Sequence, residues 1–148
     1  MTIADVLTKD LKGDILIIGP PSSGKSWLAP RIGLPIIHTD SFIDYGYKIA
    51  LYKLMDYMEV TPAPRVIEGV LGYRLLRKGV ELGTYYPDTV IELEVSPERI
   101  EKTYKEERDA KKLAYIKQFN DTHAKILADY RAMNNPNKPV WYTVKNDY

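Results

Sequence analysis

One short segment of the chain has the residue types and the spacing that bind a polyphosphate. It matches the pattern G-x-x-x-x-G-K-[ST] at every fixed position. Its residues, called the phosphate loop below, are Gly19, Pro20, Pro21, Ser22, Ser23, Gly24, Lys25 and Ser26. Glycines let such a loop curve so that backbone N–H groups point at a phosphate, and the following helix directs its positive end there. We therefore expect Lys25 to reach the β- and γ-phosphates of a nucleotide and the Ser26 hydroxyl to bind Mg²⁺.

The phosphate loop follows an apolar run, and further apolar runs recur along the chain. Continuous apolar runs are typical of parallel strands that are covered on both faces. Strands are predicted at residues 14–19, 34–40, 65–70, 89–95 and 140–146. Helices are predicted at residues 24–31, 41–59, 71–79, 96–112 and, after a bend, 113–133, with a short helix or irregular lead-in at 2–12. This alternation predicts an α/β fold in three layers, with helices on both faces of a five-stranded parallel sheet.

The bulk composition narrows the class of protein. The 148 residues suit one domain, so residues 1–148 are interpreted as a single unit. The absence of cysteine excludes disulfides, zinc–thiolate sites and cysteine nucleophiles. A formal net charge of +1 gives no argument for a nucleic-acid partner. The first residues lack an apolar signal core and no apolar run is long enough to span a membrane, so we expect a cytoplasmic protein without a membrane partner.

The phosphate loop, set between a buried strand and a helix, resembles that of the P-loop NTPase superfamily. The small kinases of that superfamily, related to adenylate, uridine, gluconate and shikimate kinases, are the most similar. The resemblance covers most of the chain and is specific at the phosphate loop. It implies a P-loop kinase fold that uses ATP and Mg²⁺. The guanine-reading N/TKxD motif of other members is not found, since TVKND at residues 143–147 does not match it.

Acidic residues follow two other predicted strands, at the edge where parallel sheets bind ligands. The resemblance implies that Asp40 orients the acceptor hydroxyl or takes its proton; the alternative is a helix N-terminal acid beside Ser41. Glu68 ends the third strand in VIEGV, a feature similar to uridine kinase-like sequences. It would approach Mg²⁺ or hold the acceptor, and the alternative is a pairing with a nearby Lys or Arg. His38 is expected to be structural and His123 to lie on the surface.

Residues 41–60 stand where the related kinases bind their acceptor. Tyr45 and Tyr47 are the tyrosines nearest Asp40 in the sequence, and we expect them to bind the acceptor, by stacking if it has a ring. Arg74 follows the third strand, and it either faces the acceptor or is solvated.

Residues 98–112 resemble the lid of these kinases, here a short helical flap. The lid supplies an arginine that neutralises the transferring phosphoryl group; Arg108 is the first candidate and Arg99 the second. The alternative is an ordinary charged helix with i,i+4 ion pairs such as Glu101–Lys105. The resemblance also implies an adenine site near the lid and the turn before the last predicted strand, where residues 134–138 would line it.

These residues together predict an ATP-dependent kinase that phosphorylates a hydroxyl of a nucleoside, a nucleotide or a modified DNA base. HTDSF, VIEGV and the minimal lid resemble virus-encoded kinases that act on hydroxymethyluracil in DNA. The near-neutral charge does not favour a DNA acceptor, because DNA-binding surfaces are usually basic. The alternatives are a small-metabolite kinase of the gluconate or shikimate type, a toxin-like kinase that acts on a nucleotide sugar, and a non-catalytic nucleotide-binding switch.

Overall fold

The computed structural model describes residues 1–21 and 23–146, including their side chains except those of Ile100 and Thr103. Its helices are α1 (Ile3–Leu7), α2 (Lys25–Ile32), the 3₁₀ helix η1 (Thr39–Tyr45), α3 (Tyr47–Val60), α4 (Gly72–Leu82), α5 (Pro97–Glu106) and α6 (Ala110–Ala132). Its strands are β1 (Asp14–Ile18), β2 (Ile36–His38), β3 (Arg65–Glu68), β4 (Thr89–Val95) and β5 (Val140–Asn146). The predicted alternation of strands and helices is confirmed.

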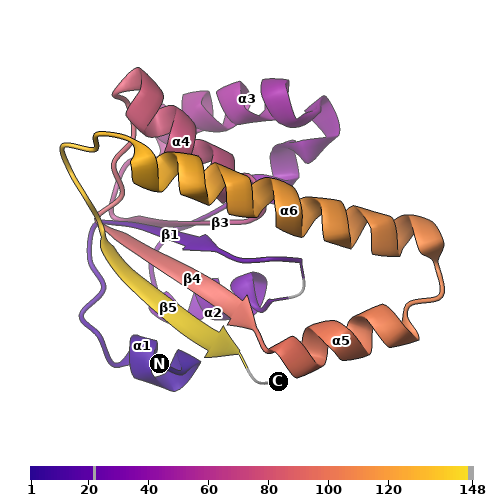
Figure 1. Ribbon diagram of the computed structural model, residues 1–148. Helices are drawn as coiled ribbons and strands as arrows, with labels where there is room; N and C mark the ends of the chain where they lie inside the picture. The colour runs from indigo at the N-terminus through magenta and orange to yellow at the C-terminus, as the bar shows by residue number, and fades with distance from the viewer. Residues whose placement is uncertain (22, 147–148) are drawn as a thin grey trace.

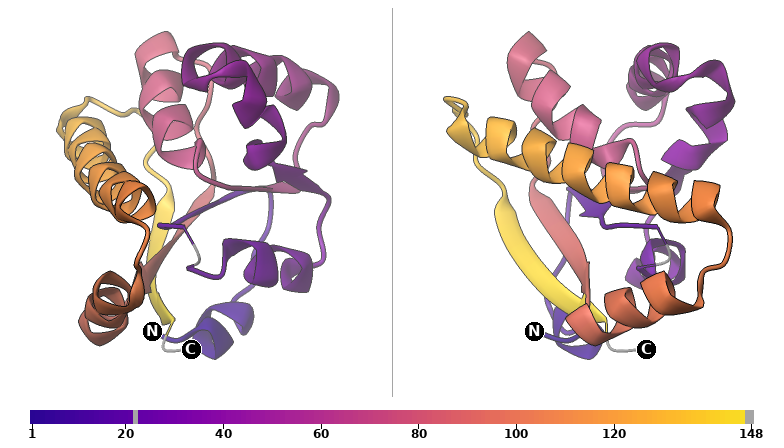
Figure 2. Two further views of the ribbon diagram at one scale, coloured as in Figure 1. Left: turned by 90° about the vertical axis from the view of Figure 1, so that its right-hand side faces the viewer. Right: turned by 45° about the vertical axis from the view of Figure 1, so that its right-hand side comes forward.

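The five strands form one parallel sheet in the order β2-β3-β1-β4-β5. β1 lies in the centre and all five of its residues are buried, because helices cover the sheet on both sides. Helices α3, α4 and α6 lie on one face, and α1 and α2 lie on the other (Figures 1 and 2). The prediction of a three-layer α/β/α fold is therefore confirmed, and the arrangement is consistent with a P-loop-like fold.

Alternate residues of β1 contribute to two separate cores, as the pleat of a strand requires. Leu16 and Ile18 pack with buried residues of α3, α4 and α6. Ile15 and Ile17 pack with buried residues of α1 and α2, among them Leu28. An apolar run with no polar face is stable only where both faces are covered, and this placement explains the sequence pattern of β1.

Some predicted boundaries move, each for a local physical reason. The strand predicted at 34–40 ends at His38, and the chain continues as η1 up to Gly46. Gly46 has a φ of +79°, so helix α3 starts only after it. The bend predicted after residue 112 occurs earlier, because Asp109 accepts hydrogen bonds from the N–H groups of Lys111 and Lys112 and starts α6 there.

Helix α4 continues through Gly79, where the sequence predicted its end. A Cβ at this position would lie only 2.7 Å from the carbonyl oxygen of Tyr85. Gly79 therefore does not end the helix. Its lack of a side chain lets the segment at Tyr85 pack directly against α4.

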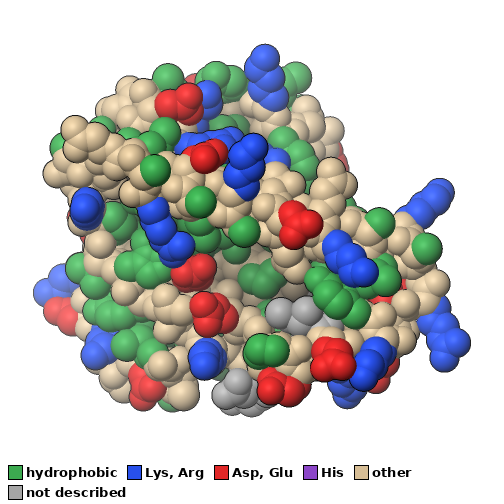
Figure 3. Space-filling view, viewed as in Figure 1, with side chains coloured by type: hydrophobic (Ala, Val, Ile, Leu, Met, Phe, Trp, Pro, Cys, Tyr) green, Lys and Arg blue, Asp and Glu red, His purple; other side chains and the backbone are tan. Residues whose placement is uncertain are grey.

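The surface shows no area of a single charge on the face seen in Figure 3. Lys and Arg side chains alternate there with Asp and Glu side chains. Among the helices that the structure describes, none has the length and apolar character needed to cross a membrane.

Candidate active site

The phosphate loop connects the carboxyl end of β1 to the first turn of α2. Lys25, the first residue of α2, is only 7% exposed, and its Nζ donates hydrogen bonds to the carbonyl oxygens of Gly19 (2.9 Å) and Pro20 (2.8 Å). Gly24 precedes it with a φ of +101°, a conformation that favours glycine. The predicted loop therefore encloses its own lysine. Ser22, also predicted to bind the nucleotide, lies outside the described residues.

Two carboxylates act electrostatically on Lys25. Burial lowers the pKa of Lys25, and the negative charges of Glu68 and Asp40 oppose that shift. Lys25, Asp40 and Glu68, which the sequence analysis placed at the ends of three different strands, therefore lie close enough for the two carboxylates to affect the pKa of the lysine. This convergence follows from the sheet, because the carboxyl ends of parallel strands meet at one edge.

A cleft of about 510 Å³ opens beside the phosphate loop and is called the Lys25 cleft here. Residues from four segments line it, among them Ser23, Lys25, Ser26, Trp27, Asp40 and Tyr115. The structure therefore brings the loop residues and Asp40 to one cavity. Ser26 is exposed, as a hydroxyl that binds a ligand must be.

Asp40 is fixed by the turn that follows β3. Its Oδ1 accepts a hydrogen bond from the N–H of Val70 (3.3 Å), and the buried Thr39 hydroxyl accepts one from the N–H of Leu71 (3.3 Å). Gly69 allows this contact, because a Cβ there would overlap Thr39 Oγ1 and lie 2.9 Å from Asp40 Oδ1. The exposed carboxylate of Asp40 is thereby held at the cleft by the backbone of the neighbouring strand.

Glu68 is 2% exposed and has one partnered oxygen and one without a partner. Its Oε1 lies 2.6 Å from His38 Nδ1. Its Oε2 is buried without a hydrogen-bond partner among the described residues. A buried carboxylate oxygen without a donor is costly, so this atom is suited to a water or cation that accompanies a ligand. His38 is half exposed and positions this carboxylate, a role that the sequence analysis did not assign.

No group of three or more His, Cys, Asp and Glu side chains in the described part of the chain could hold a metal ion alone. Mg²⁺ usually retains several waters and is bound by one or two protein ligands together with substrate phosphates. Ser26 lines the Lys25 cleft and Glu68 does not, so their joint binding of Mg²⁺ remains a prediction.

Arg74 and Tyr47 do not line the Lys25 cleft, and Arg74 lines a separate cavity. The guanidinium of Arg74 lies over the Tyr47 ring, 4.3 Å from its centroid, and the Tyr47 hydroxyl lies 3.3 Å from that of Tyr115, which lines the cleft. Tyr45 is 53% exposed, with the ammonium of Lys53 4.4 Å from its ring centroid, and it does not line the cleft. Binding of an acceptor by Tyr45 remains a prediction.

The expectation for His123 was wrong, since it is 4% exposed. Its ring stacks on Phe119 with centroids 3.8 Å apart and lies 4.7 Å from the Tyr73 ring. Burial lowers the pKa of His123 to about 4. The sequence carried a signal for this: Phe119 and His123 are spaced i,i+4, so they share one face of a helix.

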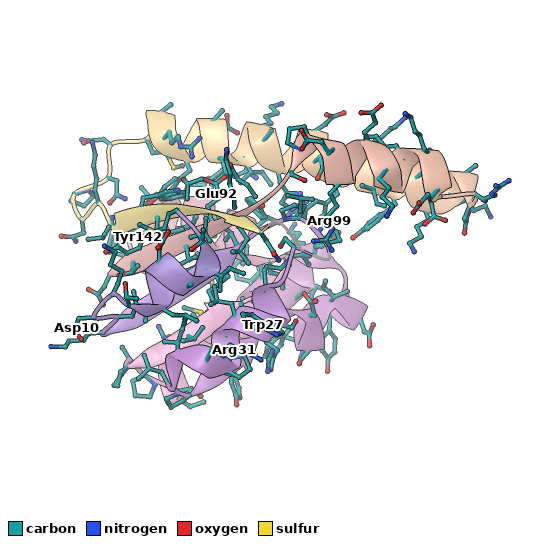
Figure 4. The ribbon with its side chains drawn as sticks, turned by 90° about the horizontal axis from the view of Figure 1, so that it is seen from below. Asp10, Trp27, Arg31, Glu92, Arg99 and Tyr142 are labelled. Carbon is teal, nitrogen blue, oxygen red and sulfur yellow. The ribbon has the colours of Figure 1, made fainter. Side chains whose placement is uncertain are left out.

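The lid arginines occupy different places. Arg99 lies on α5 and lines a second cleft of about 440 Å³, together with Pro20 and Pro21 of the phosphate loop (Figure 4). Arg108 is exposed in the turn between α5 and α6 and lines neither this cleft nor the Lys25 cleft. The structure therefore favours the second lid candidate by position, and the role of Arg108 remains a prediction.

Residues 134–138, expected to line the adenine site, lie far from the phosphate loop, and their role remains a prediction. This turn precedes the first residue of β5, so it lies at the amino end of the parallel sheet (Figure 1). The phosphate loop lies at the carboxyl end. β5 has seven residues and separates the two by roughly 20 Å.

Asn146 and Trp27 are further site residues that the sequence analysis missed, as it missed Tyr115. Asn146 is the last residue of β5, and its Nδ2 donates a hydrogen bond to the carbonyl oxygen of Ser23 (2.8 Å). Trp27 lines the Lys25 cleft with a half-exposed ring, and the guanidinium of Arg31 lies 3.5 Å from the centroid of that ring (Figure 4). No sequence motif marks Asn146, whose contact joins positions 123 residues apart.

Comparison with protein-family models and with curated protein sequences gives no match for this chain.

Proposed function

We propose that this protein is an ATP- and Mg²⁺-dependent kinase that phosphorylates a hydroxyl group of a small acceptor. The observation that carries the proposal is the Lys25 cleft, which the phosphate-loop lysine and Asp40 both line. A lysine that contacts phosphates and a carboxylate that contacts a hydroxyl are the two groups that phosphoryl transfer requires side by side.

In the proposed reaction, a bond forms between the acceptor oxygen and the γ-phosphorus, and the bond from that phosphorus to the β,γ-bridging oxygen breaks. Asp40 orients the acceptor hydroxyl and receives its proton as the new bond forms. Lys25 leaves the carbonyl oxygens of its own loop and pairs with the β- and γ-phosphate oxygens, where negative charge accumulates. The products are ADP and the phosphorylated acceptor.

Ser26 and Glu68 would hold Mg²⁺, the former through its exposed hydroxyl and the latter through its unpartnered Oε2. The ion supplies neutralisation of phosphate charge when bound. Arg99, in the cleft that also contains Pro20 and Pro21, would provide further positive charge above the phosphate loop. Closure of α5 and α6 over the loop would exclude water, because ATP would otherwise be hydrolysed.

The acceptor classes that fit are nucleosides, nucleotides and modified bases such as hydroxymethyluracil. The net charge of +1 and the mixed charges on the face seen in Figure 3 do not favour a DNA-bound base, since proteins that bind the phosphate backbone usually have a basic surface. Trp27 and Tyr115 provide aromatic surfaces in the cleft, which suits a planar acceptor. A cytoplasmic location, where ATP is abundant, is part of this proposal.

The test compares Asp40→Asn with Asp44→Asn, a matched change of an exposed acid in the same 3₁₀ helix. ADP release is measured with ATP and Mg²⁺ across nucleosides, nucleotides, hydroxymethyluracil-containing DNA, gluconate and shikimate. Asparagine retains the oxygen that accepts the hydrogen bond from Val70, so ATP binding should persist. Acceptor-dependent turnover should fall about 100-fold or more in Asp40→Asn and stay unchanged in Asp44→Asn.

Unchanged transfer in Asp40→Asn would remove this residue from the mechanism. A wild-type protein that binds ATP but responds to no acceptor would instead support a nucleotide-binding switch.

A further inference from the structure

The guanidinium of Arg74 is half-buried and has no counter-ion in the described part of the chain. It lies in the first turn of α4, and no described carboxylate is within ion-pair distance of it. Its polar partner is His123, whose Nε2 lies 3.0 Å from Arg74 Nη1. A partly desolvated guanidinium that lacks a carboxylate is poorly compensated, and burial accordingly lowers the pKa of Arg74.

The acids that line the same cavity as Arg74 are paired with other cations. A cavity of about 420 Å³ between α3, α4 and α6 is lined by five charged residues including Arg74. In it, Arg77 pairs with Asp129 at 3.0 Å and Lys78 pairs with Glu81 at 3.4 Å. With these two pairs neutralised, Arg74 gives the residues that line the cavity a net positive charge.

His123 fixes the direction of the guanidinium without neutralising it. His123 Nδ1 lies 2.7 Å from the carbonyl oxygen of Phe119, an acceptor, so Nδ1 carries the proton and Nε2 can accept from Arg74. The Tyr47 ring supports the flat face of the guanidinium. Two neutral groups thus hold an arginine in one orientation and leave its charge available, which favours recognition of an anion over a structural ion pair.

A single chain of contacts links this arginine to the Lys25 cleft. Tyr47 contacts Arg74 on one side and the hydroxyl of Tyr115 on the other, and Tyr115 lines the cleft together with Asp40. Arg74 itself lines the neighbouring cavity between α3, α4 and α6. Tyr115 connects the two sites, because the charges of both Asp40 and Arg74 act on its hydroxyl.

We propose that the acceptor carries a phosphomonoester, which Arg74 binds while the hydroxyl to be phosphorylated lies at Asp40. This inference rests on the proposed kinase function and narrows its acceptor class. A phosphomonoester matches the guanidinium fork and supplies the charge that the cavity lacks. A neutral nucleoside would leave Arg74 without a counter-ion.

The first experiment needs no catalysis. Inorganic phosphate is titrated by calorimetry into Lys25→Ala, which removes the cation of the phosphate loop, and into this variant combined with Arg74→Ala or Arg77→Ala. Phosphate should bind to Lys25→Ala, and Arg74→Ala should weaken it about ten- to hundredfold, as expected for hydrogen bonds to a charged group. Arg77→Ala, one helical turn further along and paired with Asp129, should have little effect. Equal binding to the Arg74 and Arg77 variants, or none to Lys25→Ala, would overturn the proposal.

The second experiment measures transfer to matched acceptors. 5-Hydroxymethyl-2′-deoxyuridine is compared with its 5′-monophosphate, and glucose with glucose 6-phosphate. At least one phosphorylated member should show the higher kcat/KM, and Arg74→Ala should raise its KM about tenfold or more while leaving the neutral member unchanged. Arg74→Lys, which keeps the charge but not the fork, should restore part of the loss.

Preference for the neutral members, or for a free carboxylate such as gluconate, would overturn the phosphomonoester assignment. Failure of the kinase proposal appears differently: phosphate would still bind through Arg74, while no acceptor of either kind would raise ADP release.

Discussion

Gly69→Ala tests the contact that places Asp40 at the cleft. Gly69 has a φ of +135°, and a Cβ there would overlap Thr39 Oγ1 and approach Asp40 Oδ1 to 2.9 Å. The methyl group would therefore displace the end of β2 from the turn after β3. Two hydrogen bonds would be lost with it, from the N–H groups of Val70 and Leu71.

The expected loss of stability has two parts. A side chain at this φ costs about 1–3 kcal/mol, and each of the two hydrogen bonds contributes about 1 kcal/mol. The sum, about 3–5 kcal/mol, is below the usual stability of a domain, so the variant should fold. For a chain of this size the Tm should fall by about 10 °C or more.

The effect on transfer should exceed the effect on nucleotide binding. Asp40 moves with Thr39, and a displacement of about 1 Å costs roughly 100-fold in rate, whereas Lys25 contacts the loop carbonyls of Gly19 and Pro20. Acceptor-dependent ADP release should therefore drop about 100-fold while the Kd for ATP changes little. Thermal unfolding, ATP titration and ADP release measure the three quantities.

Gly33→Ala is the matched control. Gly33 also has a positive φ, +83°, but nothing lies within 4 Å of its Cβ position. This variant should show the backbone cost alone, about 1–2 kcal/mol, with normal transfer. If Gly69→Ala were no less stable than Gly33→Ala and transferred phosphate normally, the reasoning about Asp40 would be refuted.

Two further predictions concern buried side chains. Asn146→Ala removes the hydrogen bond from β5 to the Ser23 carbonyl, so this variant should bind ATP about tenfold more weakly in an equilibrium titration. Asn137→Ala, a change at an exposed position, is the control and should bind ATP normally. Equal affinities of the two variants would exclude a role for β5 in holding the loop. His123 has a folded-state pKa near 4, below the unfolded value of 6.5, so its stabilising contribution is present above about pH 6.5 and is lost as the pH falls towards 4. His123→Gln should therefore lose less unfolding free energy between pH 7 and pH 4 than the wild type in urea denaturation; parallel losses would contradict the assigned pKa.

Much of the candidate site could be predicted from the sequence. It depends on the residues of one short loop and on the rule that the carboxyl ends of parallel strands meet at one edge of a sheet. The phosphate loop needs only its own glycines, lysine and serine, with a strand before it and a helix after it. Asp40 and Glu68 were expected near Lys25 because they follow parallel strands, and such ends meet at one edge. That expectation required no knowledge of which strand lies beside which.

Contacts between segments that are distant in the chain could not be predicted from the pattern of apolar and polar residues. Apolar runs are the same for any strand order, so β2-β3-β1-β4-β5 could not be read from them. The lid offered two arginines of equal character, and only the position of α5 brings Arg99 beside Pro20 and Pro21. The distance of residues 134–138 from the phosphate loop was not expected either, because it depends on the direction of β5, which places its preceding turn at the far edge of the sheet.

The sequence by itself determined that a glycine-rich loop ending in Gly-Lys-Ser precedes a helix in a parallel α/β chain, since glycine, lysine and apolar periodicity act over a few residues. Only the tertiary structure decided that Asn146 holds the Ser23 carbonyl and that the His123 ring contacts the guanidinium of Arg74. These contacts depend on how whole helices and strands pack against one another. Packing of that kind is a property of the entire fold, and local spacing alone does not specify which distant residues meet.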